Sequence, residues 1–93
     1  MVDNNIWELL TLSIKDKNKY MEAINQIYKI SSDYNIEIKN IIKDYLNYII
    51  HQKPEYVSSS YLKFTEFIMH LIEPPIDYIV KYSVLKLHEL FNT

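Results

Sequence analysis

Three residues that could bind a metal ion, Glu66, His70 and Glu73, are spaced by four and three positions. On a helix this spacing places all three on one face, where carboxylate and imidazole groups could ligate a transition metal. The same spacing is typical of a solvated stripe with an intrahelical acid–base pair. We favour the solvated stripe and expect no bound metal. A small enzyme or metal-binding bundle built around these residues is an alternative hypothesis.

The chain contains no glycine and no cysteine, and this excludes several kinds of active site. Loops that bind phosphate groups need backbone conformations that glycine adopts at little cost, so a P-loop or a dinucleotide-binding fingerprint is excluded. Without cysteine there are no disulfides, thiolate metal ligands or thiol nucleophiles. We therefore expect a non-catalytic domain with no catalytic residue, no cofactor and no small-molecule substrate.

A basic cluster, Lys15, Lys17 and Lys19, could contact the phosphate groups of a nucleic acid. However, Asp16 lies inside the cluster and the formal net charge of the chain is −2. Arginine, the residue that most often recognises guanine and phosphate in a bidentate manner, is absent. We interpret the cluster as a solvated loop and expect no direct, sequence-specific reading of DNA.

Hydrophobic residues recur every three or four positions along most of the chain, which is the pattern of amphipathic helices. Asp3 or Asn4, Asp16 and the serines at 58–60 are suitable N-cap residues. The pattern predicts helices over residues 4–14, 16–32, 36–52, 60–73 and 76–91. A chain of 93 residues has room for one domain. We therefore expect residues 1–93 to form a single compact all-α bundle of about five helices.

The fourth predicted helix carries apolar residues around most of its circumference, so we expect it to be central and largely buried. Pro74 cannot continue this helix, because proline lacks an amide hydrogen and its ring clashes with the preceding turn. Pro75 suits the first turn of the next helix. The two prolines therefore predict a tight, stiff corner between the last two helices.

The last predicted helix has two apolar faces, although a monomer needs only one buried stripe. The main face is expected to enter the core. The second face is formed by Tyr78, Tyr82, Leu85 and His88. We expect these four residues to contact another protein chain.

The order of these elements resembles the C-terminal helical collar domain of the small subunits of replication factor C, the AAA+ clamp loader. The resemblance is carried by "WELLTLSIKDKNKYMEAINQIYKI", "YNIEIKNIIKDYLNYI" and "YLKFTEFIMHLIEPPIDYIVKYSVLKLHELF". Ala23 and the run Ile41, Ile42, Tyr45 and Leu46 match the family by position and character. Two corners that commonly contain glycine in that family differ here: they read "DYN" at 33–35 and "EPPI" at 73–76.

The resemblance implies an oligomerisation domain that acts in DNA replication by holding clamp-loader subunits together through its last helices. The ATPase modules would lie upstream, so residues 1–93 would be the excised C-terminal part of a longer chain. The partners would be other protein subunits, in a homo- or hetero-oligomer, and contact with DNA would be only indirect. The location would be nuclear in a eukaryote. The alternative is a stand-alone small helical interaction or regulatory protein, such as a viral or bacterial adaptor that dimerises.

The start of the chain, "MVDNNIWELL", is acidic and polar and does not match a secretory signal peptide. The sequence also lacks a run of about eighteen apolar residues, the length that a membrane-spanning helix needs. We therefore expect an intracellular protein that makes no contact with a membrane.

Overall fold

The computed structural model describes residues 2–93 and contains five α-helices and two short 3₁₀ turns. No strand occurs in this range, so the predicted all-α bundle is confirmed. The 3₁₀ turns lie at Lys17–Lys19 and Pro54–Tyr56. The helices are α1 (Asn4–Lys15), α2 (Tyr20–Tyr34), α3 (Ile38–Gln52), α4 (Ser59–His70) and α5 (Ile76–Phe91).

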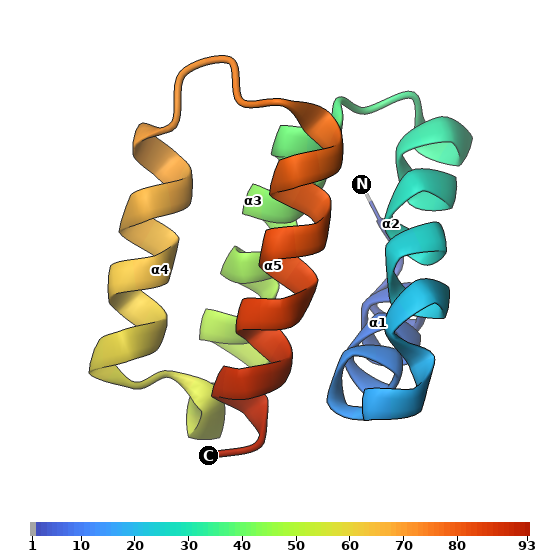
Figure 1. Ribbon diagram of the computed structural model, residues 1–93. Coiled ribbons are helices and arrows are strands. Elements are labelled where there is room, and N and C mark those ends of the chain that lie inside the picture. The colour runs from blue at the N-terminus through green and yellow to red at the C-terminus, as the bar shows by residue number, and fades with distance from the viewer. Residues whose placement is uncertain (1) are drawn as a thin grey trace.

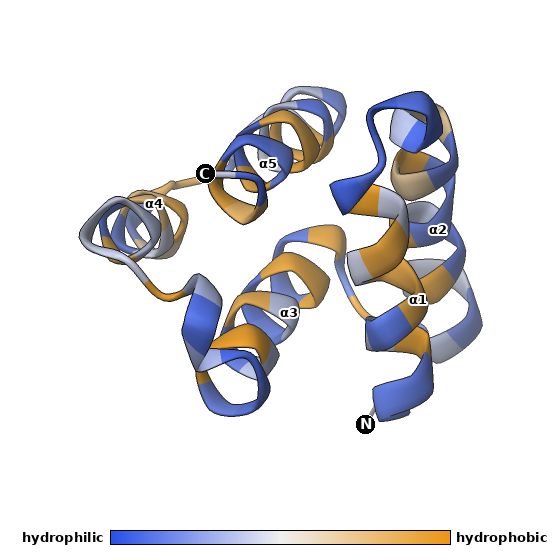
Figure 2. Ribbon diagram, turned by 90° about the horizontal axis from the view of Figure 1, so that it is seen from below, coloured by the Kyte–Doolittle hydropathy of each residue, from blue (hydrophilic) through white to orange (hydrophobic). Residues whose placement is uncertain are grey.

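Helices α3 and α5 form the middle of the bundle (Figures 1 and 2). Helices α1 and α2 pack against them on one side, and α4 packs against them on the other (Figure 2). The whole bundle measures 31 × 28 × 25 Å. None of the helices described by the structure combines the length and the apolar character needed to cross a bilayer.

Polar side chains cap three of the helix starts, and this fixes where those segments begin. The carboxylate of Asp3 accepts a 2.8 Å hydrogen bond from the Asn5 amide at the start of α1. Asp16 accepts a bond of the same length from the Asn18 amide, which starts the 3₁₀ turn that leads into α2. These two predicted caps are confirmed, and a hydroxyl of the serine run, that of Ser58, caps α4.

Helix α2 lies later in the chain than predicted: it begins at Tyr20, after the 3₁₀ turn, and ends at Tyr34 rather than at residue 32. Asn35 closes the helix in the left-handed conformation, with φ of 53°. The amide of Ile36 then donates to the Ser31 carbonyl at 3.1 Å, which satisfies one of the free carbonyls of the last turn. The sequence "DYN" at 33–35 therefore forms the last residues of the helix and its cap.

The hydrophobic core receives side chains from all five helices. Helix α3 contributes buried residues along its whole length, because its apolar residues recur every three or four positions and line the sides that contact α2, α4 and α5. The largest fully buried side chains are Tyr45, Tyr61, Leu10, Ile14, Ile41, Leu46, Ile49, Ile68, Ile79, Leu87, Val80 and Val84. Figure 2 shows the apolar segments of the helices turned toward one another.

The expectation that the fourth helix is central and largely buried is wrong. Helix α4 lies at the edge of the bundle, and only Tyr61, Phe64 and Ile68 are buried along it. These three residues are spaced by three and four positions and face α3 and α5. The other apolar side chains of α4, including Leu62 and Phe67, remain exposed, because a helix at an edge has neighbours on one side only.

The double proline also acts differently from the prediction. Helix α4 ends at His70, and residues 71–75 form a connector before α5 begins. A proline ring clashes with the carbonyl four residues earlier in a helix, and for Pro74 that residue is His70. The helix therefore ends a full turn before the proline. Pro75 occupies the N-cap position of α5, so the expected tight corner is instead a connector over residues 71–75 that bends at Glu73.

Candidate protein-interaction surface

An aromatic groove lies between α4 and α5. Phe64 and Phe67 of α4 contact Tyr82 of α5, with ring centroids 5.9 and 5.7 Å apart. The groove has a volume of about 310 Å³, and its border is formed by Ser60, Lys63 and Lys86. We call these six residues the α4–α5 groove. It offers an apolar floor with positive charge at its rim.

Of the four residues predicted to contact a partner, Tyr82 lines this groove and Tyr78 lies beside it. Tyr78 stacks on Tyr82 with ring centroids 5.7 Å apart and planes within 5°. Tyr78 is 51 % exposed, whereas Tyr82 packs against the core and is half-buried. Together with Phe67, which is 41 % exposed, they form a continuous row of rings across α4 and α5.

The other two residues, Leu85 and His88, border a different hollow, about 270 Å³ in volume, between α5 and the start of α2. Leu85 is 55 % exposed there. The Nδ1 atom of His88 lies 2.8 Å from the carbonyl oxygen of Ile14, and because a carbonyl only accepts, this nitrogen carries the hydrogen. Asn92 donates to the next carbonyl, that of Lys15. His88 therefore joins α5 to the free carbonyls at the end of α1.

The three residues considered as metal ligands do not share one helical face. Glu66 and His70 lie on α4, but the helix ends at His70 and Glu73 lies in the connector. Glu73 has φ of 47°, which directs the chain away from the helical path. Among residues 2–93, no three histidine or acidic side chains lie close enough together to hold a metal ion.

The basic cluster near the start of the chain is also divided. Lys15 lies over the ring of Tyr56, with its nitrogen 5.3 Å from the ring centroid, so it helps to hold the turn after α3 against α1. Lys17 and Lys19 are exposed in the 3₁₀ turn, next to Asp16. The cluster does not form one basic face.

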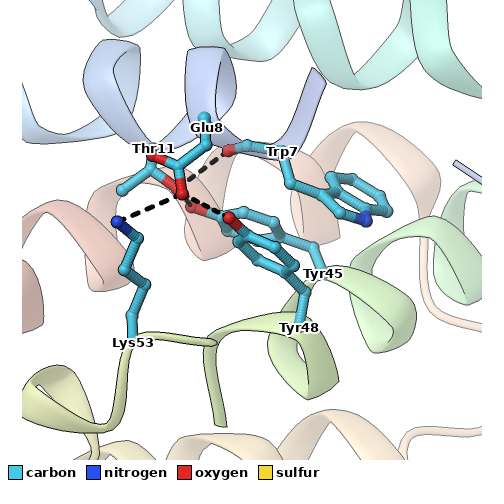
Figure 3. A network of polar contacts seen from close by, with 6 residues as sticks. All are labelled: Trp7, Glu8, Thr11, Tyr45, Tyr48 and Lys53. Atoms are coloured by element: carbon cyan, nitrogen blue, oxygen red, sulfur yellow. Dashed lines mark hydrogen bonds and ion pairs between the residues drawn. The ribbon is translucent and has the colours of Figure 1, made fainter. Parts of the chain in front are cut away.

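A network of polar contacts joins α1 to the end of α3 (Figure 3). Glu8 accepts a hydrogen bond from the Tyr48 hydroxyl, and its carboxylate lies 3.1 Å from the Lys53 nitrogen. Beside it, the hydroxyls of Thr11 and Tyr45 are 2.7 Å apart. Both hydroxyls are buried in the core, and a buried hydroxyl without a hydrogen-bond partner would destabilise the fold. The network therefore fixes the position of α1 on α3.

The network is poorly suited to acid–base catalysis. Hydrogen bonds from Tyr48 and Lys53 hold the pKa of the Glu8 carboxyl below its ordinary value of 4.5. Burial raises the pKa of the Tyr45 hydroxyl well above its usual range. A general acid or base works best with a pKa near the operating pH, and both groups are shifted away from neutrality. We therefore interpret the network as structural.

We expect this network to make the stability of the fold pH-dependent at both ends of the scale. The pKa of Glu8 is lowered in the fold, so its contribution is present above pH 4.5 and is lost as the pH falls through the lowered value. Burial and the Glu8 carboxylate raise the pKa of Tyr48 from 10.0 to about 12. Its contribution is therefore present below pH 10 and is lost as the pH rises toward 12.

Urea denaturation at a series of pH values checks this expectation with Tyr48→Phe, which keeps the ring and removes the hydroxyl. This change should weaken the loss of stability at both ends of the scale. Some alkaline sensitivity should persist, because burial also raises the pKa of Tyr61. Tyr78→Phe, on the exposed part of α5, is the control and should leave the profile unchanged. A Tyr48→Phe profile identical to the wild type would contradict the role of the network.

Sequence reasoning missed the α4–α5 groove because its residues come from two helices. Phe64 and Phe67 belong to the apolar pattern of the fourth predicted helix, and Tyr82 belongs to the last one. Their spacing along the chain does not show that they meet. The sequence signal for this groove is the excess of apolar residues on the fourth predicted helix. The same excess also predicts a buried helix.

Comparisons with known proteins return no relative: no protein-family model, no curated protein and no solved structure matches this chain. What the chain does is therefore inferred from its own side chains and surfaces.

Proposed function

We propose that this chain is a non-catalytic helical domain that binds other protein subunits through the face formed by α4 and α5. The observation that carries this proposal is the row of exposed apolar side chains on that face. Phe67 and Tyr78 are each at least two-fifths exposed there, and Leu85, which is 55 % exposed, continues the stripe of Tyr78 and Tyr82 along α5 at helical spacing. The bundle buries its core without these side chains. Aromatic and large apolar side chains exposed side by side are typical of protein-binding surfaces.

We further propose that the domain is the collar of a clamp-loader small subunit, acting in DNA replication with sister subunits as partners. The backbone at two corners supports this proposal. Asn35 and Glu73 have φ of 53° and 47°, and they are the residues with positive φ among the described residues. Glycine adopts such conformations most easily. Both residues lie in the corners where the resembled family commonly has glycine.

In the proposed role this chain performs no catalysis, and any reaction takes place in another part of the assembly. The chain has no glycine or cysteine, and in the polar network between α1 and α3 the pKa values of Glu8 and Tyr45 are shifted away from neutrality. In a clamp loader, ATP hydrolysis would belong to modules upstream in the parent chain, and DNA would be contacted only indirectly. A stand-alone adaptor that dimerises through the same face is the alternative.

Replacing both Tyr78 and Leu85 by glutamate is expected to weaken association by about tenfold or more, because charge placed in the centre of an apolar interface is costly to desolvate. Sedimentation velocity over a wide concentration range measures this effect. Both residues are half-exposed, so circular dichroism should show an intact fold. Leu12→Glu is the matched control, because Leu12 is equally exposed but lies on α1. An equal effect of the control would contradict the assignment of the face.

The clamp-loader proposal needs a separate experiment, in which the purified chain is mixed with ATPase-bearing clamp-loader subunits and analysed by size-exclusion chromatography. A collar domain is expected to co-elute with them, and the Tyr78→Glu/Leu85→Glu variant should not. Self-association without co-elution would favour the stand-alone alternative. A chain that neither self-associates nor co-elutes would contradict the proposed function itself.

A further inference from the structure

The connector between α4 and α5 presents one apolar side chain to solvent while both of its ends are anchored. At its start, the carbonyl of Leu71 accepts a hydrogen bond from the Lys39 ammonium group, and the Leu71 side chain packs against the core. Just beyond its end, Asp77 accepts a hydrogen bond from the Tyr28 hydroxyl. Between these anchors, Ile72 is 88 % exposed, more than any other large hydrophobic residue that the structure describes.

The connector is also conformationally restricted. Pro74 and Pro75 have φ values fixed by their rings, and Glu73 is held in the left-handed region. Ile72 and the acidic Glu73 are therefore displayed together in one arrangement. A segment that is already ordered loses less conformational entropy when it binds. We call Ile72 and Glu73 the connector knob.

The α4–α5 groove is compatible with this knob in size and complementary to it in charge. Its floor is aromatic, and a volume of about 310 Å³ admits a branched aliphatic side chain with its flanking backbone. Its rim carries two lysines, and the knob carries a carboxylate. Lys63 and Glu73 both lack an ion-pair partner among the described residues, while Lys86 lies 3.7 Å from the carboxylate of Glu89.

We propose that the connector knob of one copy of this chain inserts into the α4–α5 groove of a second copy. Ile72 then covers the rings of Phe67 and Tyr82, and Glu73 pairs with Lys63 at the rim. Because Ile72 is 88 % exposed, the knob does not occupy the groove of its own copy. The inference rests on the proposed function and names its partner as an identical chain.

A knob and a groove are different surfaces, so this contact is head-to-tail and not two-fold symmetric. Each copy in a pair retains one free knob or one free groove, and further copies add until the assembly closes into a ring or continues as a chain. One side chain in one groove buries less area than a stable interface needs, so association is weak and concentration-dependent.

Two variants that each lose one half of the contact test this geometry. Ile72→Asp removes the knob and keeps the groove, whereas Phe67→Glu disrupts the groove and keeps the knob. Each variant alone is expected to be monomeric in sedimentation velocity. An equimolar mixture should form 1:1 dimers and no larger species, because one intact knob and one intact groove remain between the two partners. Leu12→Glu, on α1, should associate as the wild type does.

The charge pair gives a second, independent test. Lys63→Glu and Glu73→Lys should each weaken association by about tenfold, and the chain that carries both changes should recover it. All four positions changed in these tests are exposed, so loss of the fold is not the expected cause, and circular dichroism checks this point.

Four results would overturn the inference. Wild-type-like association of Ile72→Asp, with a monomeric Phe67→Glu, would indicate a symmetric α4–α5 interface and leave the proposed function intact. Failure of the mixture to form dimers would have the same meaning. A wild-type chain that is monomeric at every concentration but co-elutes with clamp-loader subunits would assign the groove to a partner of different sequence. Absence of both kinds of binding would remove the proposed function as well.

Discussion

Replacing Trp7 by alanine is expected to lower the free energy of unfolding by about 3–5 kcal/mol, the usual cost of removing a large buried aromatic side chain. Trp7 is 4 % exposed, and its ring centroid lies 5.3 Å from that of Tyr45 and 6.3 Å from that of Tyr48. These three rings form the apolar side of the contact between α1 and α3 (Figure 3). A domain of this size has a total stability of roughly 5–15 kcal/mol, so the loss is a large part of it.

Urea denaturation followed by circular dichroism measures the effect, since the substitution removes the only tryptophan available for fluorescence. Leu12→Ala is the matched control on the same helix, because its side chain is 62 % exposed. It should change the free energy of unfolding by no more than about 0.5 kcal/mol. A similar small effect of Trp7→Ala would show that α1 does not pack on α3 in this way.

The helices could be predicted from the sequence because each has a clear period or a cap. The predicted limits of the last helix, residues 76–91, agree with α5, and residues 36–52 differ from α3 only at the start. Asp3 and Asp16 act as caps because a carboxylate satisfies free amides wherever a helix begins, independently of the tertiary fold. These features depend on local interactions, and local interactions can be inferred from neighbouring residues.

The position of α4 could not be predicted, because the period of a helix shows which residues are apolar but not how many neighbours it has. Leu62 and Phe67 have the same character as buried residues, yet they are exposed at the edge of the bundle. The end of α4 could have been predicted more closely, since the ring of Pro74 excludes a helical carbonyl at His70. The predicted helix ends at residue 73, directly before Pro74, because the prediction does not allow for the clash between a proline and the carbonyl four residues earlier.

In the candidate site, too, features that depend on one helix could be predicted, and features that depend on how the helices pack could not. The exposure of Tyr78 and Leu85 could be inferred, because both lie away from the main apolar stripe of the last helix. The role of His88 could not, since its partner is the Ile14 carbonyl, 74 positions away. The α4–α5 groove depends in the same way on two helices meeting, and the exposure of Ile72 depends on where the connector is anchored.

Replacing Tyr61 by alanine is expected to detach α4 from the bundle and to cost about 3–5 kcal/mol. Tyr61 is fully buried, and its hydroxyl donates a 2.8 Å hydrogen bond to the Leu46 carbonyl of α3. Burial raises the pKa of this hydroxyl above its usual range, so it remains protonated and able to donate. Since α4 packs only along one side, the loss of its largest buried residue should affect this helix more than any other.

Hydrogen exchange measures this effect helix by helix. In Tyr61→Ala, the amides of α4 should lose protection first, while those of α3 and α5 should keep theirs until the whole domain unfolds. Tyr61→Phe, which retains the ring, should cost only about 1 kcal/mol, and Leu62→Ala, an exposed neighbour, should cost little. Because Phe64 and Phe67 depend on α4 for their position, Tyr61→Ala should also abolish association. Uniform loss of protection across all five helices would instead mean that α4 unfolds only with the rest of the domain.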